Sequence, residues 1–417
     1  MPGPVSVREL RYLSGTTYNK TFTAADNAAW AAGTATKLRA TAYDGSGLVH
    51  NGEEDATLQT RTFAKPANVP TLRNGNLKFS TYLGAAESDA TANPIATLAS
   101  KIMGGLALPL SSRTETLDSV GVHTTTRLYS TGIESNCVIG QAVLVGTRGD
   151  AAGNGEVRVI ADVQTNYVDL AMALSGAPAD GATVVISTTA YLDQDSTQDY
   201  LDFLAIGMDA DDQLQTIGGM GPLTFAGLGV GELPMAEYDI AVGDWREVSV
   251  GGNPDQLEPT AAPQGNAPPT DRGLGCFTIG DTGTTTFNSM YVSNLAIDPG
   301  LVYEPLPDMC GVNGVGGWVK TASAPTISFD VVMDGADADI LPGLHNDFTS
   351  GQAKQIMAQF GHAAQACCAI DLQNVYLDQS PTRTDIGALA GLSVSGHGSE
   401  GTTTTDIMAS SVRVHWF

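Results

Sequence analysis

The sequence predicts a mainly β protein, on three observations. Apolar side chains recur at every second position in many stretches of the 417 residues, as at Leu77, Phe79 and Leu83. The 48 glycines and 20 prolines favour turns and interrupt helices. Only two segments combine a helix start, an apolar face and a stop. We therefore expect two tandem β-sandwich or barrel domains, each flanked by one α-helix, and a small inserted β-barrel.

The first expected helix follows the strand that contains Leu77 and Phe79. Asn93 is a suitable N-cap, Pro94 fits the first helical position, and Gly104 is a suitable stop. Between them, the apolar residues share one helical face: Ile95, Leu98, Ala99, Ile102 and Met103.

The same succession is expected again near the C-terminus. Ile327, Phe329, Val331 and Met333 alternate as in a strand. A second helix is then predicted with Ser350 as N-cap and Gly361 as the stop. Its apolar face would consist of Ala353, Ile356, Met357 and Phe360.

These two stretches favour an internal duplication. The strand that begins at Asn76 matches the one at Thr326 with an offset of about 250 residues, and the helix patterns match with nearly the same offset. We therefore predict a first domain formed by residues 1–136 and 193–250, and a second domain at 273–417. Residues 251–272, rich in Pro, Gly, Asn and Gln, would link them.

The segment 137–192 differs from both halves. Short strands are predicted at 141–146, 156–163, 167–174 and 183–191, joined by Gly- and Pro-containing turns. We interpret it as a small β-barrel inserted into the first domain. The alternating end of the chain, from Val412 to Phe417, is expected to join a sheet.

Charge narrows the classes of function. The chain has 20 Lys and Arg against 45 Asp and Glu, a formal net charge of −25. This balance disfavours a nucleic-acid-binding surface, which needs clustered cations, and a polybasic membrane anchor. No Lys or Arg lies between Arg158 and Arg246. Such a one-signed region would repel a polyanion or bind cations, or it would simply keep the protein soluble.

Signals for export, metal binding and catalysis are missing from the sequence. The N-terminus does not follow the signal-peptide pattern. The five cysteines are an odd, sparse set without zinc spacing, which we interpret as reduced, buried thiols of a protein formed in a cytoplasm. Asp193, Asp195 and Asp199 resemble the start of an EF-hand loop without its glycine and closing glutamate. Phosphate-loop, nucleophile-elbow and zincin motifs are absent. We predict no enzyme activity and no catalytic, cofactor-binding or metal site.

The ordered features resemble a bacteriophage tail tube protein, the major tail protein of long-tailed phages. The resemblance rests on the strand, acidic loop and capped helix at 76–103 and 326–360, and on the opening Val-Arg-Glu-Leu-Arg-Tyr-Leu-Ser-Gly-Thr-Thr-Tyr. It implies duplicated tube domains, trimeric pseudo-hexameric rings stacked into a tube, and favours a non-contractile, siphovirus-like tail. It also implies a virion protein assembled in the host bacterial cytoplasm, with tape measure and tail terminator proteins as partners.

The resemblance also gives a role to the acidic residues. A basic lumen would hold genomic DNA by counterion release, whereas an acidic one lets the DNA pass during ejection without specific binding. We expect some of the 45 acids to line the lumen. The alternatives are another virion or surface β protein (a receptor-binding tail component, a capsid decoration or a surface-layer subunit) and a β-sandwich carbohydrate-active enzyme.

Overall fold

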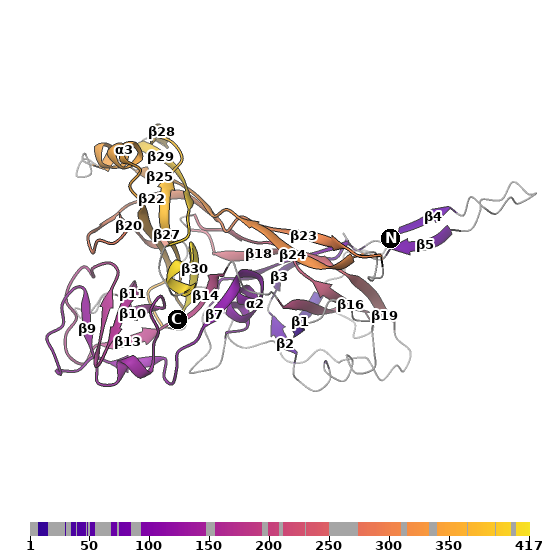
Figure 1. Ribbon diagram of the computed structural model, residues 1–417, viewed down its shortest axis with the longest axis horizontal. Helices are drawn as coiled ribbons and strands as arrows, with labels where there is room; N and C mark the ends of the chain where they lie inside the picture. Colours follow the sequence, from indigo (N-terminus) through magenta and orange to yellow (C-terminus); the bar gives the residue numbers. More distant parts are fainter. Residues whose placement is uncertain are drawn as a thin grey trace, which may run out of the picture.

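The computed structural model confirms the mainly β fold (Figure 1). None of the helices that it describes combines the length and apolarity that a membrane-spanning helix needs. The structure describes residues 7–15, 30, 35–38, 40–46, 48, 51–54, 68–72, 75–84, 93–146, 155–193, 199–207, 212–229, 231–249, 274–309, 315–332, 340–364, 366–387, 389–401 and 406–417. The predicted linker at 251–272 lies outside these residues.

Two sheets of the first half, residues 7–249, pack face to face. Phe79 of one sheet contacts Phe203 of the other, with ring centroids 5.3 Å apart, and stacks on Tyr238 at 4.7 Å. One sheet has four strands in the order β17 (Leu223–Ala226), β18 (Met235–Val242), β6 (Gly75–Tyr82) and β3 (Ala40–Asp44). The other has five, in the order β19 (Asp244–Ser249), β16 (Asp212–Gly219), β15 (Tyr200–Gly207), β1 (Val7–Gly15) and β2 (Thr36–Leu38).

The second half, residues 274–417, contains a sheet that curls over its own core. Phe277 from one end of the sheet packs against Phe329 from the other, with ring centroids 4.8 Å apart. The order is β21 (Phe287–Ser289), β20 (Leu274–Asp281), β26 (Lys354–Phe360), β27 (Cys368–Leu377), β29 (Leu389–Gly398), β25 (Thr326–Val332) and β22 (Val292–Asp298). Strand β28 (Thr382–Ile386) pairs with β29. The main hydrophobic core runs continuously through both halves.

The first predicted helix is confirmed as α2 (Pro94–Met103). The Asn93 Oδ1 accepts a hydrogen bond from the N–H of Ile95 at 2.9 Å, and Gly104 ends the helix with a φ of 114°. The apolar face is buried, with Ile95, Leu98 and Ile102 inaccessible to solvent. Local capping and periodicity therefore specify this helix, and core packing uses the face that they create.

The second predicted helix is wrong. Residues 354–360 form strand β26, and the helix α3 (Ile340–Ser350) comes before it. Ser350 is its last residue, and Gly351 follows with a φ of 66°. The residues of the predicted helical face divide between the two sides of β26, since Ile356 and Phe360 belong to the main core and Met357 to a separate cluster, and both faces are buried. Ladder partners on both sides, β20 and β27, satisfy the backbone as a helix would.

The C-terminal strand prediction is confirmed by β30 (Val412–Trp416). It lies between β27 and β14 (Thr188–Leu192), and β14 also pairs with β7 (Gly104–Ala107). Its two faces are both buried: Val414 and Trp416 belong to the main core, while Phe417 packs into a separate cluster. Because β14 comes from the first half, β30 joins the two halves in one sheet.

A further six-stranded sheet forms a separate unit, which we call the module. The Asp118 N–H donates to the Tyr129 carbonyl at 3.2 Å, which holds the two edge strands of this sheet close together. The sheet encloses a hydrophobic core that is separate from the main one. The strand order is β8 (Thr114–Thr116), β13 (Thr183–Ile186), β10 (Ala142–Val145), β11 (Glu156–Gln164), β12 (Tyr167–Leu170) and β9 (Arg127–Tyr129). The 3₁₀ turn η1 covers Ile133–Ser135. Compared with the predicted insertion at 137–192, the sheet takes in β8 and β9, and β14 pairs elsewhere.

The module is packed against the second half. One face of β10, β11 and β13 shares a hydrophobic cluster with Met357, Ala369 and Phe417. Gln359 adds polar contacts, since its Oε1 accepts from Val157 N–H at 3.0 Å and its Nε2 donates to the Gly155 carbonyl at 2.7 Å. Figure 1 accordingly shows β30 and β27 between the module and strands β22, β25, β28 and β29.

Two hairpins lie apart from these sheets. One consists of β23 (Leu301–Pro307) and β24 (Val315–Ser323), and the other of β4 (Asn51–Glu54) and β5 (Asn68–Leu72). Figure 1 places β4 and β5 at one end of the long axis and the module at the other. The short helix α4 (Asp406–Ala409) precedes β30.

Candidate assembly surface

The four-stranded sheet of the first half stands beside four strands that belong to the larger curled sheet of the second half. Strand β17 neighbours β22, so the strands follow the order β3, β6, β18, β17, β22, β25, β29 and β28. A hollow of about 300 Å³ spans the junction and is lined by residues from both sheets, among them Thr224, Ala296, Ser328 and Ser395. The same face of both sheets therefore turns away from the core. We call these eight strands the wall.

The alternation within each wall strand separates an apolar face from a polar one. Leu77, Phe79, Tyr238 and Ile327 point into the main core. The side chains that alternate with them are small, polar or acidic. They include Asp44, Asn76, Lys78, Glu237, Asp239, Thr224, Ala296, Asp298, Ser328, Asp330 and Ser395.

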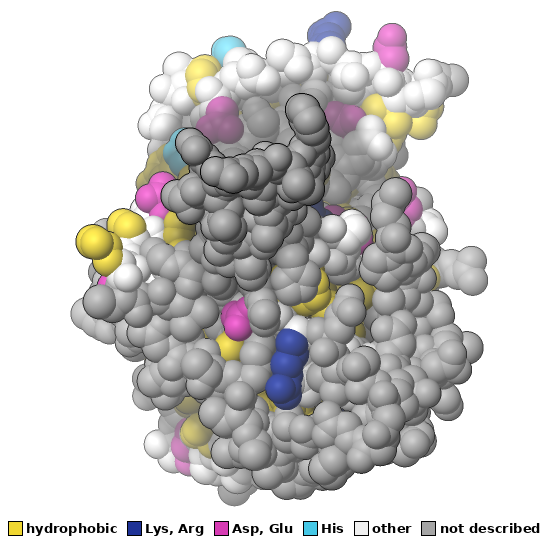
Figure 2. Space-filling model, turned by 90° about the vertical axis from the view of Figure 1, so that its right-hand side faces the viewer, with side chains coloured by type: hydrophobic (Ala, Val, Ile, Leu, Met, Phe, Trp, Pro, Cys, Tyr) yellow, Lys and Arg dark blue, Asp and Glu magenta, His cyan; other side chains and the backbone are white. Residues whose placement is uncertain are grey.

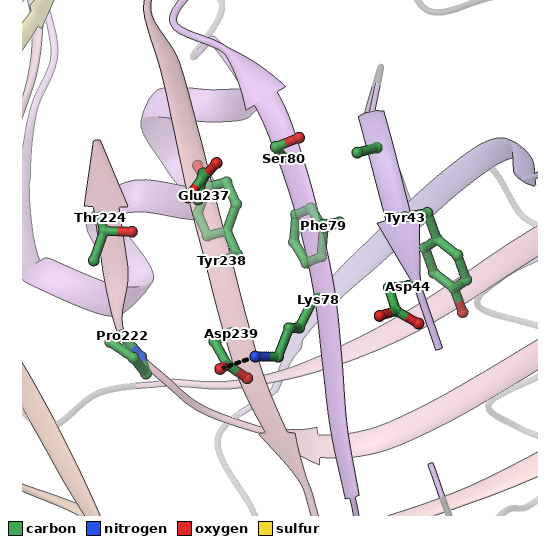
Figure 3. Close-up of a pocket in the computed structure, with 11 residues that line it drawn as sticks. Tyr43, Asp44, Lys78, Phe79, Ser80, Pro222, Thr224, Glu237, Tyr238 and Asp239 are labelled. Atoms are coloured by element: carbon green, nitrogen blue, oxygen red, sulfur yellow. Dashed lines mark ion pairs between the residues drawn. The ribbon is translucent and has the colours of Figure 1, made fainter. Parts of the chain in front are cut away.

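The first sheet of the wall holds a second hollow, of about 450 Å³ (Figure 3). Lys78 and Asp239 meet within it at 2.9 Å, and Asn76 Nδ2 donates to the other oxygen of Asp239 at 2.9 Å. Lys78 is the one basic side chain among the described residues that line the two hollows. Asp44, Glu237, Asp298 and Asp378 are acidic, so the wall carries a net negative charge there.

Local hydrogen bonds keep these charges in place. The bond to Asp239 raises the pKa of Lys78, so the ammonium stays charged and neutralises one carboxylate. Bonds from the hydroxyl and the N–H of Ser46 lower the pKa of Asp44. Exposed ion pairs of this kind contribute little to stability. They affect the charge of the surface instead, and that charge stays negative.

Both ends of the wall are free strand edges in the described part of the chain. β3 pairs with β6, and β28 pairs with β29, while the ladders described give neither strand a second partner. An unpaired edge presents a row of N–H and C=O groups that another strand can join. The wall thus has one such edge at each side.

The β23–β24 hairpin offers an apolar surface next to the wall. Its inner side is fixed to the first half, because Tyr303 OH donates to the Ile102 carbonyl at 2.5 Å and the Trp318 N–H donates to Tyr200 OH at 3.1 Å. Its other side exposes apolar side chains: Val302, Leu306 and Val319, with Met309 beyond the end of β23. Exposed apolar side chains on a fixed ribbon suit a protein–protein contact.

Several other polar residues in the described part of the chain are taken up by local pairs. Asp199, from the EF-hand-like stretch, pairs with Lys101. His397 pairs with Asp378 at 2.5 Å, and His345 bonds Ser380 at 2.8 Å. Within the described ranges, groups of His, Cys, Asp and Glu that could hold a metal ion are absent.

The sequence did not single out the acids of the wall. A signal was nevertheless present, because Lys78, Glu237 and Asp239 occupy polar positions that alternate with core residues. Comparison of the sequence with protein-family models and with curated proteins found no match.

The surface view agrees with a sparsely charged, polar second sheet. In Figure 2, the top of the molecule, where Figure 1 places β28 and β29, shows mostly white atoms of backbone and uncharged polar side chains. Single acidic side chains interrupt it, with one Lys or Arg at the upper edge.

Proposed function

We propose that this chain is a structural, non-enzymatic subunit of a phage tail tube, which assembles as stacked rings around an acidic lumen. Genomic DNA would pass through that lumen during ejection without specific binding. The subunit would reside in the virion tail after assembly in the host bacterial cytoplasm. Its partners would be further copies of itself, with tape measure and tail terminator proteins at the ends of the tube.

The wall is the observation that carries this proposal. It has eight strands, a core side and a polar side, and a free edge at each end. Joining the β28 edge of one copy to the β3 edge of the next would extend the sheet without limit unless it closes on itself. Closure would pair both of these edges, which favours a ring over an open assembly.

Strand number then sets the width of the ring. Three copies would supply about 24 wall strands, at about 4.8 Å spacing and about 40° tilt, which gives roughly 45 Å between opposite backbones. Barrels of 16 to 18 strands already leave a water-filled channel. A trimer therefore suffices to enclose a wide, open lumen.

The chemistry of the polar side suits passage rather than binding. A protein grips DNA by neutralising phosphates with Lys and Arg, and each such contact releases counterions. The single lysine in the two hollows is neutralised by Asp239, and the other charged groups there are carboxylates. Such a surface repels phosphates within about a Debye length and leaves the DNA mobile.

The module lies on the side of the molecule opposite the second sheet of the wall. Strands β26, β27 and β30 separate the two, with the main core on one face and the module cluster on the other. If the wall lines the lumen, the module faces the outside of the tube. It would then be a fixed exterior projection.

Electron microscopy of the full-length chain tests the proposal. We expect rings or hollow tubes in negative stain over a range of concentration and salt. Monomers alone under all of these conditions would contradict the proposal. Hydrolysis of a polysaccharide in a substrate panel would favour the carbohydrate-active alternative.

A pair of edge variants sharpens the test. Neighbouring residues in a strand direct their N–H groups to opposite sides, so Arg383→Pro and Thr384→Pro each remove one N–H, one toward β29 and one toward the free edge. The variant that loses the N–H toward β29 should lower the melting temperature. We expect the variant that loses the N–H on the free edge to keep the melting temperature of the monomer and to lose assembly. Assembly by that folded variant would exclude β28 as a subunit contact.

A further inference from the structure

His415 lies at the junction of the two halves and the module. It belongs to β30, where its register partners are Thr189 of β14 and Ala369 of β27. Its side chain is completely buried. A titratable group at this position has no role in the proposed wall, and the position is unusual because three parts of the molecule meet there.

The hydrogen bonds of His415 connect those three parts. Its Nδ1 lies 2.9 Å from Thr189 Oγ1 and 3.4 Å from Ser187 Oγ. Ser187 Oγ in turn accepts from the N–H of Ala142, at the start of module strand β10, at 2.9 Å. The Nε2 atom is buried without a hydrogen-bond partner among the described residues. One nitrogen of the imidazole is thus unsatisfied, so a proton on it would find no acceptor among the described residues.

The surrounding charges disfavour an imidazolium ion. Arg413, on the same face of β30, is fully buried and donates through Nε to Asp371 Oδ2 of β27 at 2.9 Å. That carboxylate also accepts from Gln355 of β26. Strand β14 presents only hydroxyl groups to the ring, and the neighbouring Thr188 accepts from Arg113 of the segment leading into the module. The Asp371 carboxylate, on the strand next to β30, is therefore already paired.

Burial and the nearby Arg413 hold the pKa of His415 well below its ordinary value. In an opened state the ring regains a pKa of about 6.5. The stabilisation is therefore complete above about pH 6.5 and is lost as the pH falls below it, since the opened state then binds an extra proton. Each further pH unit favours opening by about tenfold.

We propose that His415 makes the β14–β30 seam sensitive to acid, so that low pH releases the C-terminal strand and loosens the attachment of the module. Opening exposes the ring, and protonation then keeps the seam open. This inference concerns the single chain and does not depend on assembly into a tube.

Hydrogen–deuterium exchange of the full-length chain tests the inference. Rates measured at pH 7.5 and pH 5.0 are corrected for intrinsic exchange in peptides that cover 187–192 and 412–417. From the linkage relation we expect the opening equilibrium to rise about 30-fold in these peptides. The β26 peptide, 354–360, reports whether the second half loosens as a whole, and we expect its protection to change much less.

Two variants isolate the histidine. His415→Gln cannot be protonated, so its seam peptides should lose most of the pH dependence. His397→Gln removes an exposed histidine paired with Asp378 and should keep the full dependence. If His415→Gln does not fold, the unaltered chain still tests the proposal, because its seam peptides and its β26 peptide should differ in how much their exchange rises on acidification. Equal acid responses in the two peptides, or a wild-type response in folded His415→Gln, would overturn the proposal.

Discussion

The two halves share an order of elements and differ in what joins those elements. In each half, a wall strand (β6 or β25) is followed by a helix and by two paired strands, the second of which (β14 or β27) pairs with β30. Two further strands then complete the four wall strands of each half. They are β17 and β18 in the first half, and β28 and β29 in the second. The duplication stays a prediction, and its helix match is wrong, because Ile356 and Met357 lie in strand β26 rather than in a helix.

The difference lies between the two paired strands that follow each helix. In the second half, β26 and β27 are joined by residues 361–367, whereas in the first half the module stands between β7 and β14. The module does not stay with its own half, since it packs against Met357 and Phe417 of the other. The module is thus a contact between both halves, beside a main core that runs through both of them.

The largest expected effect comes from the aromatic residue that both halves place at matching positions. Phe79 packs against Phe203 of the opposing sheet, Phe329 packs against Phe277 across the curled sheet of the second half, and both are buried. Phe79→Ala and Phe329→Ala should each cost about 3–5 kcal/mol of unfolding free energy, because each leaves a cavity in the core. Urea unfolding measures both.

The shape of those transitions tests the comparison itself. Because the main core is continuous, either variant should lower the midpoint of one cooperative transition. Two separate transitions, with only one of them shifted by each variant, would show that the halves unfold independently.

A smaller effect separates the real helix cap from the mistaken one. Asn93→Ala removes the acceptor for the Ile95 N–H and should cost about 1 kcal/mol. Ser350→Ala, at the end of α3, should change the unfolding free energy by less than about 0.5 kcal/mol, since its hydroxyl caps no following helix. If both variants lost the same unfolding free energy in denaturant, Ser350 would act as a helix cap after all, and the strand at 354–360 would be contradicted.

The smallest effect concerns the polar side of the wall. Lys78→Gln breaks an exposed ion pair with Asp239, so neither the melting temperature nor ring formation should change measurably. The variant makes the wall more negative, and its rings should bind DNA no better in a retention assay at low salt. Stronger DNA retention would contradict an acidic, non-binding lumen.

Local signals were enough for some elements. Asn93, Pro94 and Gly104 fix the ends of α2 through backbone groups a few residues away, so the sequence predicts the helix and its bounds. The alternation of Val412, Val414 and Trp416 likewise predicts a strand. Helix α3 escaped prediction because it contains Pro342, Gly343 and several poor helix formers.

Composition and short-range pattern by themselves determined a β-rich, strongly acidic chain with one well-capped helix and a C-terminal strand. Tertiary structure decided that 354–360 is a strand, because only the neighbouring β20 and β27 supply backbone partners on both sides. It also decided which carboxylates gather on the wall and that His415 is buried at a three-way junction. Those properties depend on contacts outside the local segment, such as Met357 with Thr278 and His415 with Thr189, which periodicity within one segment does not encode.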